Sequence, residues 1–250
     1  MNRYVPFIPD DDFTECVLNV CGVYINLLKR DNPEEIFDNA IDPFKMVYDV
    51  YNTNIGLNDW FKTELVRQKD KSINNATGNF HQDLLGKVEG WVNLGVGDAS
   101  KVDLKRDDGS IFMELKNKYN TMNSDSNDKC YDKLSELAGL YPNSICYWAY
   151  VIPKNGSSGE TIWRKKGKSY NPRIIKAWGR RVYGIVTGDE NNLYRTVKAI
   201  PLCIKDNKEE LDIKLDNDDN FELIDKIFDF TFKREEDSTA FTQNSLFQYI

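Results

Sequence analysis

Residues 102–118 read VDLKRDDGSIFMELKNK and contain two runs in which apolar and polar side chains alternate. A period of two is typical of β-strands, and an Asp-Gly pair between two such runs favours a hairpin turn. If Asp108 and Gly109 are the two central turn residues, the register places Asp103 opposite Glu114. The sequence therefore predicts a β-hairpin in which two carboxylates face each other.

The second strand of this hairpin adds a lysine to the carboxylates. Glu114 and Lys116 project from one face, whereas Ile111, Met113 and Leu115 project from the other, into the core. Facing residues have Cβ atoms about 5 Å apart, so two bare carboxylates would repel each other unless a cation lay between them. A hard ion such as Mg²⁺ prefers oxygen ligands, which two carboxylates and a backbone carbonyl would supply.

Such an arrangement would suit the hydrolysis of a phosphodiester. A bound metal ion lowers the pKa of water and neutralises charge on the reacting phosphate, and Lys116 would add a positively charged donor beside it. The alternative is a solvated hairpin face without an ion. The residues by themselves leave both interpretations open, since acidic-any-Lys triplets also occur at positions 103–105, 206–208 and 212–214.

The sequence around the hairpin predicts a mixture of helices and strands. Helical spacing of apolar residues occurs before it at 13–29, 33–51, 59–68 and 77–91, with Pro33 and Thr77 as candidate helix starts. After it we expect a helix over 126–140, strands over 144–153 and 182–188, and a helix from about 189 that Pro201 would end. This order predicts an α/β fold, a mixed β-sheet flanked by helices with a helical N-terminal region.

The chain has 250 residues and is expected to form one domain. Its parts would be a mainly helical region over 1–90, a core sheet with a DNA-contact segment over 91–205, and an acidic part over 206–250. No secretory signal or apolar run long enough to cross a membrane is evident. Five scattered cysteines without a CxxC pair argue against disulfides and zinc, so we expect a cytoplasmic protein.

Charge is distributed unevenly along the chain. The formal net charge of −7 disfavours a nucleic-acid partner. However, residues 206–225 hold nine acidic side chains against two lysines, whereas residues 163–184 hold eight basic side chains and no acidic one. Basic side chains neutralise phosphates, so the second segment favours contact with DNA over the alternative of a solvated face.

Further residues are candidates for binding or excluded from catalysis. The candidate DNA contacts of the basic segment are Arg164, Lys165, Lys166, Lys168, Arg173, Lys176, Arg180 and Arg181. Lys118, Asn120 and Asn123 follow the second hairpin strand, where they would lie near a reacting phosphate or simply form a loop. His81 is expected to be structural. Glu89 is a candidate additional acidic residue, because it would share a helical face with Gln82.

The stretch VDLKRDDGSIFMELKNKYNTMNSDS (102–126) resembles the PD-(D/E)XK nuclease superfamily, and within it the type II restriction endonucleases that cut GGNCC-like sites. NFHQDLLGKVEGW (79–91) and VYGIVTGDENNLY (182–194) are also similar to that group, so the resemblance spans about residues 75–200. It implies that Asp103 and Glu114 take the two acidic positions and Lys116 the lysine position. Val102 stands where the superfamily's name puts proline, at a position that varies.

The resemblance implies an activity and its partners. We expect a Mg²⁺-dependent type II restriction endonuclease in which Asp103, Glu114 and the Leu115 carbonyl bind the metal and Lys116 orients or activates water. Its substrate would be double-stranded DNA with a short, palindromic, GC-rich site, cut by a homodimer whose cognate partner is a DNA methyltransferase. The alternatives are a structure-specific repair or recombination nuclease on the same core, and a non-catalytic DNA-binding protein.

Overall fold

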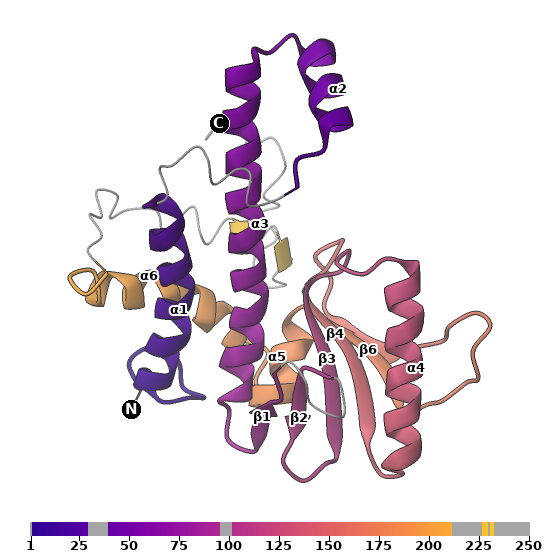
Figure 1. Ribbon diagram of the computed structural model, residues 1–250. Coiled ribbons are helices and arrows are strands. Elements are labelled where there is room, and N and C mark those ends of the chain that lie inside the picture. The colour runs from indigo at the N-terminus through magenta and orange to yellow at the C-terminus, as the bar shows by residue number, and fades with distance from the viewer. Residues whose placement is uncertain (1, 30–39, 96–101, 212–226, 230, 233–250) are drawn as a thin grey trace.

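A mixed six-stranded sheet forms the centre of the computed structural model, which describes residues 2–29, 40–95, 102–211, 227–229 and 231–232 (Figure 1). Its strands are β1 (Trp91–Asn93), β2 (Leu104–Arg106), β3 (Ile111–Lys118), β4 (Ile145–Ile152), β5 (Gly159–Ile162) and β6 (Ile174–Trp178). The helices are α1 (Asp10–Leu28), α2 (Pro43–Thr53), α3 (Leu57–Gly86), α4 (Ser124–Leu140), α5 (Arg180–Thr187) and α6 (Asn192–Asp206).

The strands are ordered β1-β2-β3-β4-β6-β5. The pairs β1–β2 and β2–β3 are antiparallel, β3–β4 and β4–β6 are parallel, and β5 joins the edge antiparallel to β6. The predicted α/β class, with a mixed sheet, flanking helices and a helical N-terminal region, is confirmed. Strands β5 and β6, which lie within or beside the basic segment, were not predicted.

The β2–β3 hairpin has the predicted register but a different turn. Leu104 pairs with Met113, and Lys105 pairs with Phe112. The Gly109 N–H donates to the Arg106 carbonyl at 2.8 Å, so the turn is centred on the two residues before Gly109. Gly109 has a φ of 70°, the left-handed region that glycine adopts without strain. The prediction of a two-residue turn was wrong, but the longer loop preserves the predicted pairing of the two strands.

Helix α3 is one continuous helix of 30 residues where two were expected. Thr77 does not start a helix, because it lies inside α3 and its hydroxyl donates to the Ile73 carbonyl at 2.9 Å. The N-terminal half of α3 and the shorter α2 project beyond the sheet (Figure 1). The other expected helix start, Pro33, lies outside the described residues.

Two predictions for the C-terminal half were wrong. Residues 182–188, expected as a strand, fall almost entirely in α5, whose buried Val182, Tyr183 and Val186 follow helical spacing. Pro201 lies inside α6 and does not end it. Since proline lacks only its own N–H and disturbs the preceding turn, a helix packed on a core can accommodate it at a cost.

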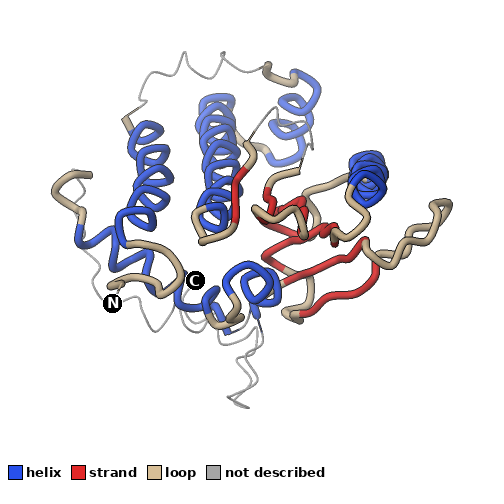
Figure 2. The backbone as a smooth tube through the Cα atoms, turned by 90° about the horizontal axis from the view of Figure 1, so that it is seen from below, coloured by secondary structure: helices blue, strands red, loops and turns tan. Residues whose placement is uncertain are grey.

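The core has two parts, one on each face of the sheet. One cluster joins the sheet to α1, α3, α5 and α6 and includes Met113 and Leu115 of β3. The other lies between the sheet and α4 and includes Phe112 and Leu134. Figure 2 shows α4 on one side of the strands and α5 on the other. Because side chains alternate along β3, Glu114 lies on the face that α4 covers.

The five cysteines, distributed over both core clusters, are all buried and unpaired. This agrees with the expectation that the chain has no disulfide framework. Within the described ranges, no helix combines the length and the apolar character needed to cross a membrane.

Candidate active site

The structure brings Asp103, Glu114 and Lys116 together. The Lys116 ammonium lies 3.3 Å from Asp103 Oδ2 and 2.8 Å from Glu114 Oε1. Glu114 and Lys116 are on the same face of β3 because they are two residues apart, and the hairpin register brings Asp103, directly before β2, beside them. A cationic group therefore lies between the two carboxylates, as their repulsion requires.

Asp103 is fixed by the backbone of the neighbouring strand. The Leu115 N–H donates to Asp103 Oδ2 at 2.7 Å, and the carboxylate-bearing side chain is only 20% exposed. Burial raises the pKa of Asp103, and the nearby charge of Glu114 raises it further, while Lys116 and the Leu115 N–H oppose these effects. The ionised form of Asp103 is therefore electrostatically unfavourable, and an added cation would stabilise it.

Lys116 keeps its proton at this position. Burial alone would lower its pKa, but the charges of Glu114 and Asp103 outweigh burial, so its pKa is raised. The ammonium therefore acts as the counter-ion of both carboxylates.

Lys133 of α4 is a fourth member of the site that sequence reasoning missed. Its ammonium lies 2.5 Å from Glu114 Oε2, the oxygen that Lys116 does not contact. Glu114 is a buried residue, with 8% of its surface exposed. One feature of the sequence could have indicated it: Lys133 directly precedes Leu134, an apolar position of α4 that packs on the sheet. With Lys133 included, the site holds two positive and two negative side chains.

The donor set suits a divalent cation such as Mg²⁺. Asp103 and Glu114 offer carboxylate oxygens, and Leu115 offers a backbone carbonyl at the same point of β3. Gln82 of α3 donates from Nε2 to that carbonyl at 3.3 Å, so a helix side chain fixes the position of the predicted ligand. In the part of the chain that the structure describes, no group of three or more His, Cys, Asp or Glu residues is assembled, so water or substrate would complete the coordination.

A cleft between β3 and α4 gives access to the site. Its volume is about 760 Å³, and Glu114 and Lys116 form part of its wall. Two lysines of α4, Lys129 and Lys133, also line it. Three acidic residues, Glu114, Asp132 and Glu136, line the same cleft, so its positive and negative side chains are equal in number.

Several basic candidates are engaged with other parts of the chain. Lys165 contacts Asp128 and donates to Asn127 Oδ1 at 3.0 Å, and Lys168 lies 2.6 Å from Asp132. These bonds hold the loop between β5 and β6 against α4.

Other basic candidates support the edge of the sheet. Arg173 donates to the carbonyls of Tyr141 and Ser144, Arg181 is paired with Glu160 and Glu190, and Arg180 is half-buried. Lys176 lies over the rings of Trp148 and Trp163, at 4.7 and 5.2 Å from their centres. Burial lowers the pKa of Lys176.

The remaining candidates are exposed at the surface. Arg164 stacks on the ring of Tyr170 at 5.4 Å, and Lys166 is exposed on the same loop. Lys118 and Asn120 are exposed where β3 ends. The neighbouring Asn123 caps α4, because its Oδ1 accepts a bond from the Ser126 N–H at 2.8 Å.

Glu89 does not join the site. Helix α3 ends at Gly86, so Glu89 lies in the turn before β1 and does not share a helical face with Gln82, which does reach the site. His81 points elsewhere, with Nδ1 3.0 Å from the Tyr183 hydroxyl on α5. Burial lowers the pKa of His81 to about 4, which keeps it neutral and agrees with a structural role.

Comparison with known proteins identifies the class. Type II restriction enzyme Sau96I of Staphylococcus aureus is 35% identical over 215 residues, covering 82% of this chain and 81% of that enzyme. Type II restriction enzyme Eco47II of Escherichia coli is 31% identical over 188 residues, covering 71% and 77%. These similarities place the chain among the type II restriction enzymes. A family model described as Eco47II restriction endonuclease matches residues 5–208, and the chain belongs to that family.

Proposed function

We propose that this chain is a Mg²⁺-dependent endonuclease of the PD-(D/E)XK type that hydrolyses phosphodiester bonds in double-stranded DNA at a short, palindromic, GC-rich site. The observation that carries the proposal is the Lys116 ammonium between Asp103 and Glu114, on a hairpin within the matched family region. The GGNCC-like site rests on the resemblance of residues 102–126 to enzymes of that group.

Asp103, Glu114 and the Leu115 carbonyl would hold Mg²⁺. Bound there, the ion neutralises phosphate charge and lowers the pKa of water. Asp103 is fixed for this role by the Leu115 N–H, and the carbonyl is fixed by Gln82. The same backbone segment thus presents one ligand and orients another.

Lys116 would orient and activate the attacking water. Its pKa is raised by the two carboxylates, so a cation held by those carboxylates would weaken the interactions that hold the lysine proton. Lys116 is then available to hydrogen-bond water beside the phosphate. The water oxygen forms a bond to phosphorus while the bond from phosphorus to the 3′ oxygen breaks. A proton leaves the water and one is taken up by the 3′ oxygen, which gives a 5′-phosphate and a 3′-hydroxyl.

Lys133 and the exposed basic residues would bind the substrate. Lys133 reaches the site from α4 and lines the cleft, so we assign it to a phosphate next to the reacting one. Of the basic segment, Arg164 and Lys166 have the exposure that a DNA contact requires. Each phosphate contact would add to affinity and to its salt dependence.

A symmetric DNA site would be met by a homodimer in which each subunit cuts one strand. A cognate DNA methyltransferase would protect the same site in the host. Both statements follow from the proposed activity.

Digestion of a sequenced DNA tests this function. With Mg²⁺ the protein should give defined fragments, and sequencing their ends should reveal one short site with 5′-phosphate termini. Chelation with EDTA should stop cleavage. A smear or branch-specific cutting would indicate a structure-specific nuclease instead, and tight binding without any cleavage would indicate a non-catalytic DNA-binding protein.

A further inference from the structure

Helix α2 presents an unusual apolar face. Phe44, Val47, Tyr48 and Tyr51 follow the i, i+3, i+4, i+7 spacing of one helical face. Their exposed fractions are 77%, 49%, 69% and 83%, and α2 contains no buried residue. The aromatic side chains of this helix are therefore directed to the outside of the chain.

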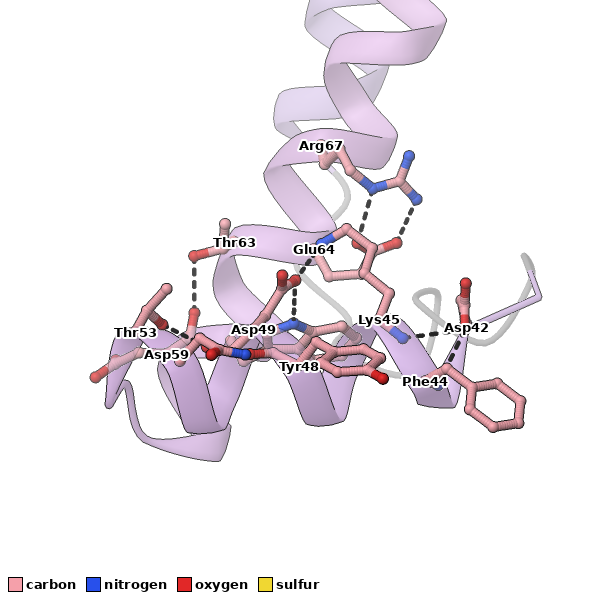
Figure 3. Close-up of polar contacts among 12 residues, drawn as sticks. Asp42, Phe44, Lys45, Tyr48, Asp49, Thr53, Asp59, Thr63, Glu64 and Arg67 are labelled. Carbon is pink, nitrogen blue, oxygen red and sulfur yellow. Dashed lines mark hydrogen bonds and ion pairs between the residues drawn. The ribbon is translucent and has the colours of Figure 1, made fainter.

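Polar groups of α2 attach it to α3. Asp49 accepts a hydrogen bond from Trp60 Nε1 at 3.0 Å and also contacts Lys45 (Figure 3). Asp42 caps the start of α2 by accepting from the Phe44 N–H at 2.9 Å, while the Phe44 ring points away from this network. The helix is thus well formed and anchored through its polar side, which leaves the aromatic side unpartnered among the described residues.

The size of this face suits a subunit interface. A fully covered aromatic side chain buries about 150–250 Å², so three aromatics that are 69–83% exposed offer roughly 350–550 Å². Val47 on the same face is 49% exposed and adds to this area. Together these side chains would supply a large part of the roughly 800 Å² per partner of a standard protein interface.

The arm formed by α2 and the N-terminal half of α3 also lies in a suitable place. It extends beyond the sheet on the side where β3 ends and α4 begins, which is the side of the candidate active site (Figure 1). Two subunits on one duplex must both direct this side to the DNA, so arms on this side are placed to meet beside it. DNA itself is a poor occupant of the face, because the only charged residues of α2, Lys45 and Asp49, neutralise each other.

We propose that a second copy of this chain docks on the apolar face of α2, formed by Phe44, Val47, Tyr48 and Tyr51. The inference rests on the proposed function, which requires two active sites for the two strands. In a two-fold interface the same face meets itself, so aromatic rings of one α2 pack against those of its partner.

Molar mass in solution tests this interface. By light scattering or sedimentation, the full-length protein should have about twice the chain mass of 29.0 kDa. The double variant Tyr48→Lys/Tyr51→Lys should weaken the dimer at least a hundredfold and run as a single chain. Both positions are largely exposed, so the fold should survive, as circular dichroism would verify. The matched control is Tyr24→Lys, at a tyrosine of α1 that is 44% exposed, and it should remain a dimer.

Cross-linking provides a second readout. All five native cysteines are buried, so a cysteine introduced on α2 is the preferred site for a short bismaleimide. Phe44→Cys, Tyr48→Cys and Tyr51→Cys are tested singly, and at least one should give a covalent dimer. Tyr24→Cys should give none.

The outcomes separate the interface from the function. A double variant that stays dimeric, or no cross-link at any of the three positions, would overturn the interface while leaving the nuclease assignment intact. A wild-type protein with the mass of one chain, both free and on a duplex, would also overturn it. Absence of cleavage by a wild-type dimer would instead contradict the proposed function.

Discussion

At the scale of single residues, charge balance describes the candidate site. Two carboxylates, Asp103 and Glu114, share two ammonium groups, Lys116 and Lys133, with all four side chains at most 27% exposed. A divalent ion added to this group would compete with Lys116 for both carboxylates. Under the proposed function, metal binding would therefore change the environment of one lysine.

Asp103→Asn should abolish cleavage without lowering stability. Removing this proposed metal ligand should reduce the cleavage rate by about 10²–10³-fold or more. The raised pKa of Asp103 means that the folded state binds its proton more tightly than the unfolded state, so ionisation at neutral pH destabilises the fold. Asparagine removes that cost and can still accept the Leu115 N–H.

Thermal denaturation measures the second effect. In EDTA the Asp103→Asn variant should melt no lower than wild type, and Mg²⁺ should raise the melting temperature of wild type only. A variant that still gained stability from Mg²⁺ would show that the ion binds elsewhere.

Lys133→Ala should slow cleavage by about ten- to a hundredfold, because a cation beside the reacting phosphates is lost. Lys133→Arg should recover part of the rate. The matched control is Lys29→Ala, at an exposed lysine after α1, which should cut normally. Single-turnover rates on one duplex provide the comparison, and equal rates for Lys133→Ala and wild type would remove Lys133 from the site.

The residues of the site differ in how far they could be predicted. Asp103, Glu114 and Lys116 lie on one hairpin, so local alternation and register were enough to bring them together. Lys133 and Gln82 come from α4 and α3, and their approach depends on how those helices pack on the sheet. A single sequence does not encode that packing in any short pattern.

At the scale of elements, α3 packs on α5 through a neutral histidine. The pKa of His81 is lowered to about 4 by burial, against 6.5 for the unperturbed group. Between these values the unfolded chain binds more protons than the folded chain, so this group removes stability as the pH falls through that window.

His81→Gln should reduce the acid sensitivity of the fold. From about pH 7 to about pH 4.5, wild type should lose roughly 2 kcal/mol more unfolding free energy than the variant, given about 1.4 kcal/mol per pKa unit. Urea titrations at several pH values provide the measurement. Parallel pH profiles for the two proteins would mean that His81 titrates normally.

The loop between β5 and β6 carries both exposed basic residues and a basic residue that is paired within the chain. Arg164→Ala/Lys166→Ala should weaken DNA binding and reduce the slope of log affinity against log salt by about 1–2. Lys168→Ala is the matched control, since Lys168 is already paired with Asp132, and its slope should be that of wild type. Fluorescence anisotropy in EDTA at several salt concentrations makes the comparison without cleavage, and an unchanged slope in the double variant would place the DNA elsewhere.

The elements with clear periodicity were predicted correctly, and the ambiguous ones were not. Helix α4 and strands β3 and β4 have long, regular patterns that survive in the structure. The short apolar run in α5 suits a strand as well as a buried helix, and only its packing on β4 and β6 decides. Strand β6 has one charged residue, Lys176, which fits into the strand because its stem is buried against tryptophan rings.

At the scale of the whole molecule, the chain combines a compact α/β core with a projecting arm. The core carries the carboxylate–lysine site, and the arm carries exposed aromatic residues that would be costly to leave in water. The mixed sheet and the family were predictable from the hairpin and its flanks. The projecting arm was not predictable from the sequence, because only its position relative to the sheet shows that the α2 aromatics lie outside the core.

The Lys116→Ala variant separates binding from cleavage and so tests whether Asp103, Glu114 and Lys116 form the hydrolytic site. On a duplex with the site read from wild-type fragments, the variant should bind within about threefold of wild type yet cleave about 10²–10³-fold more slowly in Mg²⁺. Cleavage by Lys116→Ala at the wild-type rate would show that Lys116 is not part of the hydrolytic site.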